Sequence, residues 1–200
     1  MRNVSILSIV VVMMCWYTGG STMAKGDEVN NAALQLGDLL HADWQATARA
    51  SGRTERYKPV KANGKPLIVS NQAEVDSYCD SIGVPAELRC KFRIAAGGQV
   101  EQDILAISNR YLSTNNRAEN DASANVVLKT IEDQLASGGK LDDAFVEKAS
   151  VTVHDEWMKR NSSWAPPEQM LPFSQLTKVE ADKDRAMVRI GMTLATRLGL

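Results

Sequence analysis

Residues 41–44 read HADW and residues 154–157 read HDEW, so both histidines of the chain occupy one pattern, His-x-x-Trp. Each copy lies in the second half of a segment whose apolar residues recur at i, i+4 spacing, as Leu36, Leu40 and Trp44 do. This spacing is typical of an amphipathic helix that turns one face to a core. We therefore expect two His-x-x-Trp helices.

The segments that follow these two helices are also alike. LSTNNRAEN at residues 112–120 and LTKVEADKDR at residues 176–185 both lead from a leucine and a hydroxyl residue into a charged helix. The opening leucine lies 71 residues after the histidine in the first copy and 22 residues after it in the second, a difference of 49 residues. The sequence therefore predicts two pseudo-symmetric helix-loop-helix units, the first with an insertion; coincidence is the alternative.

The remaining pattern predicts a mostly α fold with minimal strand. Asn71 with Glu74 and Thr177 with Glu180 resemble capping boxes, which open helices. Periodicity and these start signals predict helices over residues 30–50, 71–82, 85–96, 100–112, 116–135, 141–161 and 177–198, and one short strand over residues 67–69.

Composition limits the function without choosing it. The 200 residues are 44% hydrophobic and 24% charged, which is typical of a globular chain of one domain or two very small ones. The net charge of −1 gives no overall attraction to nucleic acid. The sequence has no phosphate loop, nucleophile elbow or zinc-helix motif, although many carboxylate pairs could still form. We expect no catalysis, no cofactor, no metal and no nucleic-acid partner.

The first residues allow two interpretations. Residues 4–17 are apolar and are followed by small residues, the layout of a secretory signal peptide, but the run is too short to span a bilayer comfortably. The protein would then be exported, or membrane-associated through this run. Alternatively, translation begins at Met23 and the run is an upstream leader, which would leave the protein in the cytoplasm.

The two later cysteines depend on that choice. In an exported protein Cys79 and Cys90 could form a disulfide, and in a cytoplasmic protein they would be two reduced core thiols. The sequence divides into three parts: a signal-like or leader segment at 1–26, a first helical half at 27–137 that holds both cysteines, and a C-terminal half at 138–200.

The second copy carries rare residues in a characteristic order. They are HDEW at 154–157, Trp164, LPFSQL at 171–176, Glu180, and KDR at 183–185. This order resembles the RyR (ryanodine receptor repeat) domain, which is repeated in ryanodine receptors and occurs in small bacterial and phage proteins. The resemblance covers about residues 141–198 and departs from the family at residues 163–166, where SWAP replaces a Gly-Trp-x-Tyr-Gly turn.

The resemblance implies a helical fold without known catalysis and with a role in binding nucleotides or proteins. The small prokaryotic and viral members of the family look cytosolic, which favours the start at Met23. We therefore expect an RyR-type binding module for an anionic, nucleotide-like small molecule. The alternatives are a structural or protein-interaction protein, a homodimer included, and an exported envelope protein with a Cys79–Cys90 disulfide.

Cationic residues are candidates for binding such a ligand. Residues 49–65 hold six cations against one anion. Arginine side chains match phosphate oxygens well, so Arg53, Arg56 and Lys58 are the expected contacts of a phosphorylated molecule. A solvated loop is the alternative.

Histidine and tryptophan side chains are the other candidates. His41 and His154 could contact the ligand, or each could tie its helix to a neighbouring backbone. Trp164 lies in a proline-rich loop and is the expected exposed stacking surface, whereas Trp44 and Trp157 are expected in the core.

Overall fold

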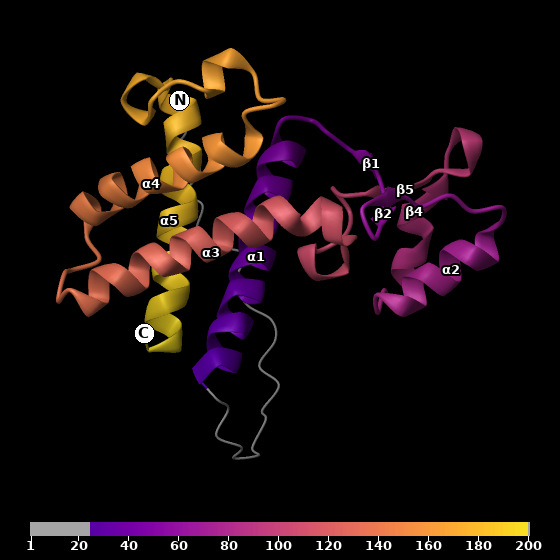
Figure 1. The fold of residues 1–200 in the computed structure, drawn as a ribbon, viewed down its shortest axis with the longest axis horizontal. Coiled ribbons are helices and arrows are strands. Elements are labelled where there is room, and N and C mark those ends of the chain that lie inside the picture. Colours follow the sequence, from indigo (N-terminus) through magenta and orange to yellow (C-terminus); the bar gives the residue numbers. More distant parts are fainter. Residues whose placement is uncertain (1–24, 200) are drawn as a thin grey trace.

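The computed structural model describes residues 25–199. Four long helices pack into one body and a lobe of short strands and one further helix projects from its side (Figure 1). The long helices are α1 (Lys25–Ala50), α3 (Thr114–Ala136), α4 (Asp143–Asn161) and α5 (Lys178–Leu198). The prediction of a mostly α fold with little strand is confirmed.

Aliphatic side chains from all four helices form the core of the helical body. They include Leu36 of α1, Ile131 of α3, Val153 of α4 and Leu194 of α5, each at most 1% exposed. These positions lie on the apolar faces that the periodicity predicted, which is why the four helices are the most accurately predicted elements.

The lobe is an insertion between α1 and α3 with a core of its own. Its sheet has the strand order β1-β5-β4, all antiparallel, and a two-stranded hairpin of β2 and β3 lies beside it. The strands are β1 (Tyr57–Pro59), β2 (Lys61–Ala62), β3 (Lys65–Pro66), β4 (Phe92–Ile94) and β5 (Val100–Asp103). Helix α2 (Gln72–Ser81) packs Val75 and Cys79 against Phe92 and Val100.

Inside the lobe the sequence prediction is partly wrong. Residues 85–96 form the 3₁₀ helix η1 (Ala86–Lys91), then β4 and the short η2 (Ala96–Gly98), in place of one α-helix. Residues 100–112 open with β5, and the strand expected at 67–69 is only a single bridge from Ile68 to Gln99. These segments pair as strands, β4 with the nearby β5, and β5 and Ile68 with distant partners, and helical periodicity does not record such pairing.

The basic stretch is likewise structured and is not a plain loop. Between Arg49 and Lys65 the chain forms β1 and β2 and enters β3. Lys58 pairs with Gln102 across the sheet, and the amide of Arg56 donates to the carboxylate of Asp103 at 2.9 Å.

The capping boxes are confirmed. The side chain of Asn71 accepts from the amide of Glu74 at 3.2 Å, and that of Thr177 accepts from the amide of Glu180 at 3.3 Å. Shortly after α3, Gly138 adopts a φ of 73°.

The lobe leaves both cysteines unpaired, which corrects the disulfide alternative. Cys79 is buried and Cys90 is exposed, and both thiols are free. Burial raises the pKa of the Cys79 thiol to about 11, which keeps it protonated at neutral pH.

No helix among the described residues is both long enough and apolar enough to cross a membrane. The apolar run at 4–17 and the alternative start at Met23 lie outside the described residues.

The two predicted helix-loop-helix units are α1 with α3 and α4 with α5. Before its second helix each unit has a one-turn 3₁₀ helix, η3 (Asn109–Tyr111) in the first and η5 (Phe173–Gln175) in the second. Each turn leads through a leucine to a hydroxyl residue that precedes the next helix, Ser113 or Thr177. Position by position, the second helix of one unit is offset from that of the other by 64 residues.

The packing of the units on each other is reciprocal. Helix α1 of the first unit contacts α5 of the second, and α4 of the second contacts α3 of the first. The remaining contact is between α3 and α5, which occupy the same place in the two units. Here Gly191 faces Val127, and these two positions are equivalent. Reciprocal contacts of this kind are what a two-fold relation between the two units produces.

Candidate ligand site between the two repeats

His41 ties α1 to the end of the lobe and to α3. Its Nε2 lies 2.9 Å from the carbonyl oxygen of Ile104 and 3.1 Å from that of Ile107. Its Nδ1 lies 3.2 Å from the side-chain amide nitrogen of Asn120 on α3. Carbonyl oxygens only accept and the amide nitrogen only donates, so Nε2 carries the hydrogen and Nδ1 accepts. Burial lowers the pKa of His41, which favours the same neutral form.

His154 repeats this arrangement in the second unit. Its Nε2 lies 2.8 Å from the carbonyl oxygen of Leu171, and its Nδ1 lies 3.2 Å from a carboxylate oxygen of Asp184 on α5. Leu171 is equivalent to Ile107 and Asp184 to Asn120.

The equivalence extends to the spacing and to the tryptophans. The histidine and its carbonyl are 66 residues apart in the first unit and 17 in the second, which reproduces the predicted insertion of 49 residues. His41 stacks with Trp44 at 5.4 Å between ring centroids, and His154 stacks with Trp157 at 6.1 Å. In each His-x-x-Trp pattern the imidazole therefore bonds the helix to a backbone carbonyl, and the indole ring stacks beside the imidazole.

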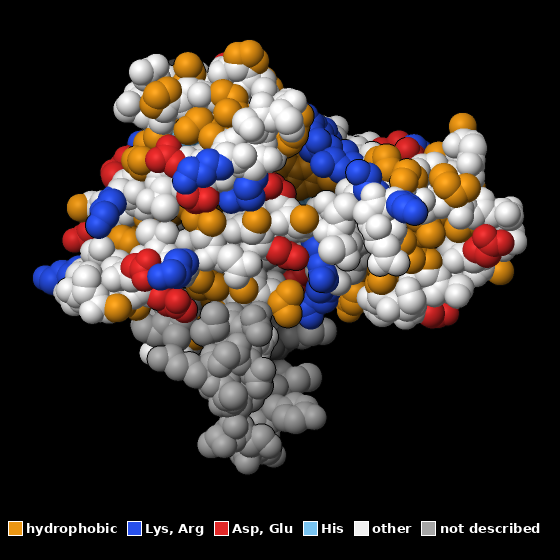
Figure 2. Space-filling view, viewed as in Figure 1, with side chains coloured by type: hydrophobic (Ala, Val, Ile, Leu, Met, Phe, Trp, Pro, Cys, Tyr) orange, Lys and Arg blue, Asp and Glu red, His pale blue; other side chains and the backbone are white. Residues whose placement is uncertain are grey.

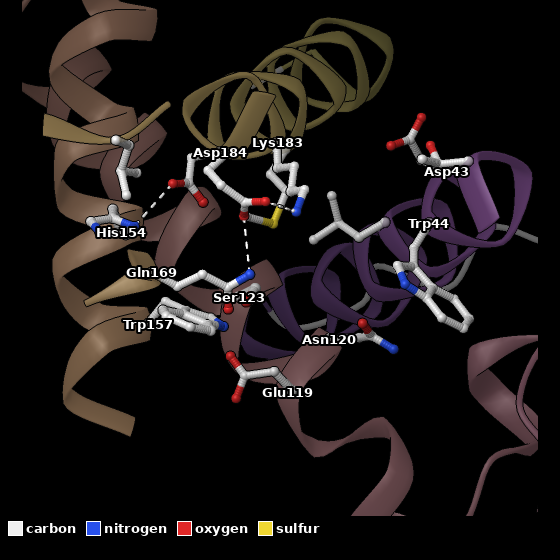
Figure 3. A pocket seen from close by; sticks show the side chains of 15 residues that line it. Asp43, Trp44, Glu119, Asn120, Ser123, His154, Trp157, Gln169, Lys183 and Asp184 are labelled. Carbon is white, nitrogen blue, oxygen red and sulfur yellow. Dashed lines mark hydrogen bonds and ion pairs between the residues drawn. The ribbon is translucent and has the colours of Figure 1, made fainter. Parts of the chain in front are cut away.

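A cavity of about 310 Å³ lies between the two units. Figure 3 shows Trp44 and Trp157 on opposite sides of it, with Asn120 on the Trp44 side and Asp184 beside His154 on the other. The lining is largely apolar, and the cavity volume is that of a site for a small organic molecule. The cavity is lined by equivalent pairs from the two units, Trp44 with Trp157 and Asn120 with Asp184.

Its charged groups are mostly carboxylates. Glu119, Glu180 and Asp184 line the cavity together with Asp43, and Lys183 is the one Lys or Arg side chain among the lining residues. Burial raises the pKa of the Asp184 carboxyl to about 6, and the neighbouring imidazole opposes this shift. Burial also raises the pKa of Asp43.

The residues expected from the sequence divide between this cavity and other places. His154 lines the cavity, whereas His41 is 3% exposed and held among backbone carbonyls behind it. Trp164 is 66% exposed, as expected, and meets Trp157 edge to face at 6.2 Å. Trp44 and Trp157 are half-buried instead of buried in the core, because they face the cavity.

The cationic candidates do not line the cavity. Arg53 is exposed, and Lys58 lies in β1, where burial and the nearby Arg56 lower its pKa. Arg56 comes nearest, since its guanidinium lies 5.4 Å from the centroid of the Trp44 ring.

Sequence reasoning missed the polar residues that complete the site. Asn120 and Asp184 are single polar positions on charged helices, and no local pattern distinguishes them. The repeat itself held the signal, because both lie seven residues after the equivalent residues Ser113 and Thr177.

Comparison of the chain with protein-family models, with curated proteins and with solved structures finds no match. The resemblance to the RyR domain therefore stays a prediction.

Proposed function

We propose that this chain is a non-catalytic binding module of RyR-like type that holds a small planar organic molecule, of nucleobase size, between its two repeats. One observation carries the proposal: the cavity lies between two equivalent indole rings, Trp44 and Trp157. Aromatic rings on two sides of a largely apolar cavity suit a flat ligand, because such rings bury much area at low entropic cost.

The state of the two histidines supports a structural role for them in place of general base catalysis. A general base needs an imidazole nitrogen that can reach the substrate. In His41 and His154 both ring nitrogens already have protein partners. They are therefore proposed to act as structural ties.

The basic stretch at residues 49–65 supports a second candidate, a site for a phosphorylated molecule. Figure 2 shows Lys and Arg side chains gathered between the helical body and the lobe, along the chain that leads from α1 to β1. Arg53, Arg56 and Lys58 belong to this stretch, and none of them forms an ion pair within the described residues. A protein partner or a second copy of the chain bearing carboxylates would fit the same surface.

A cytoplasmic location with translation from Met23 belongs to the same proposal. The free thiols of Cys79 and Cys90 support it, because reduced thiols are typical of that compartment.

Thermal unfolding with a panel of nucleobases, nucleosides and nucleotides tests the two candidate sites against each other. A ligand at about 100 times its Kd should add about 2.7 kcal/mol to the free energy of unfolding. For a ligand in the cavity, Trp157→Leu should remove most of this stabilisation and the double variant Arg53→Gln/Arg56→Gln should keep it. If Trp157→Leu keeps the stabilisation and the double arginine variant removes it, the ligand binds the basic stretch. Stabilisation by no compound would contradict the proposal.

A further inference from the structure

Among the residues that line the cavity, carboxylates outnumber cations. Lys183 donates to Glu180 at 2.6 Å, and Arg160 donates to Glu119 at 2.7 Å, so both cations are already paired with carboxylates of the lining. Asp43 stands apart, because its carboxylate has no ion-pair partner among the residues whose side chains the structure describes.

The position equivalent to Asp43 in the second unit does have an ion-pair partner. The position equivalent to Asp43 is Glu156, which lies outside the cavity lining and pairs with Lys159 at 2.6 Å. The position equivalent to that lysine in the first unit is Ala46. The first unit therefore keeps an unbalanced carboxylate at the cavity and places no cation next to it on α1.

Asp43 also neighbours Trp44, one of the two rings of the cavity. An indole face attracts cations through its quadrupole, and a carboxylate adds direct charge attraction. A phosphate or carboxylate entering here would meet Asp43, and Lys183, the one Lys or Arg of the lining, is already paired with Glu180. The guanidinium of Arg56 lies 5.4 Å from the centroid of the Trp44 ring but does not line the cavity.

From the cavity between two indole rings and the unpaired Asp43 at its edge, we infer that the ligand is a planar organic cation, such as an amidinium or a protonated nitrogen heterocycle, and that Asp43 contacts its positive group. This inference rests on the proposed function and names the ligand class of that same cavity. It differs from the nucleotide-like anion that the sequence predicted.

Three isosteric probes separate charge from shape: 2-naphthamidine, 2-naphthamide and 2-naphthoate, which are cationic, neutral and anionic at neutral pH. Titration by calorimetry should give the order amidine, amide, naphthoate, with the amidine tightest. Asp43→Asn should weaken the amidine about fivefold, which corresponds to about 1 kcal/mol for one partly screened ion pair, and should leave the amide unchanged. Glu156→Gln, at the equivalent position outside the cavity, is the matched control and should leave all three affinities unchanged.

The outcomes distinguish this inference from the proposed function. Equal or tighter binding of 2-naphthoate would overturn the cationic ligand and leave the cavity as a binding site. The expected order with no effect of Asp43→Asn would overturn the assignment to Asp43. Binding of none of the three probes up to millimolar concentration would overturn both the inference and the proposed function.

Discussion

Asp184 is the residue at which the two repeats differ most in their chemistry. It occupies the place of Asn120, and each of these side chains contacts Nδ1 of its histidine at 3.2 Å. The amide does not titrate, and burial lowers the pKa of its histidine, which favours the neutral form. The carboxyl can hold or release a proton inside a buried pair, so the second unit alone carries a titratable link at this position.

Replacement of Asp184 by asparagine should therefore change the pH dependence of stability. The pKa of this carboxyl is raised to about 6 in the folded chain and returns to its ordinary value near 4 on unfolding. Between these two values the folded chain holds a proton on Asp184 that the unfolded chain has released. The contribution of this proton to the free energy of unfolding is therefore complete below about pH 4 and is lost as the pH rises through about 6. Asparagine has no carboxyl to titrate, so its variant should not lose this free energy. Relative to wild type, the free energy of unfolding of Asp184→Asn should rise by about 1–3 kcal/mol between pH 4 and pH 7.

Urea unfolding at several pH values measures this gain. Asp155→Asn, at an exposed carboxylate one residue after His154, is the matched control and should follow the wild-type profile. A profile of Asp184→Asn parallel to that of wild type would show that the carboxyl does not titrate in this interval.

At the scale of the elements, the contact of α3 with α5 depends on one glycine. A Cβ on Gly191 would lie 2.3 Å from a methyl carbon of Val127 and 3.2 Å from the terminal carbon of Ile131. The close approach of α3 and α5 thus requires glycine at position 191 of α5, although glycine costs about 1 kcal/mol in a helix interior.

Gly191→Ala should consequently destabilise the chain despite its better helix propensity. Overpacking costs about 1–3 kcal/mol, which exceeds or offsets the propensity gain of about 1 kcal/mol. The double variant Val127→Ala/Gly191→Ala makes room for the new methyl group and should show a favourable coupling of about 0.5–3 kcal/mol in a denaturation cycle. Strictly additive effects would indicate that the helices do not meet at this pair.

The elements also show what sequence can predict here. Helices whose apolar faces pack on each other, and starts fixed by a neighbouring side chain such as Asn71 or Thr177, are determined within a few residues of chain and were predicted correctly. The residues of β4 and β5 were assigned to helices although these strands pair with each other across a short connection; β5 also pairs with β1, which lies about 40 residues earlier. The site follows the same division: the His-x-x-Trp pairs are local and were found, whereas their partners Asn120 and Asp184 come from another helix.

For the whole molecule, the lobe is what distinguishes the first repeat from the second. It carries the basic strand β1 and reaches the cavity wall through Arg56, which lies over Trp44. The second repeat replaces this lobe by a short segment in which Trp164 contacts Trp157. Trp44 therefore has a guanidinium as its neighbour outside the cavity, and Trp157 has a second indole. The two repeats are alike, but the site between them is asymmetric.

The indole N–H signals of isotope-labelled protein report directly on whether a ligand occupies the cavity between the repeats. On titration with 2-naphthamidine, the signals of Trp44 and Trp157 should shift together and saturate with one Kd, because both rings line the same cavity. Shifts confined to the backbone amides of Arg53, Arg56 and Lys58, with both of these indole signals unmoved, would contradict the account.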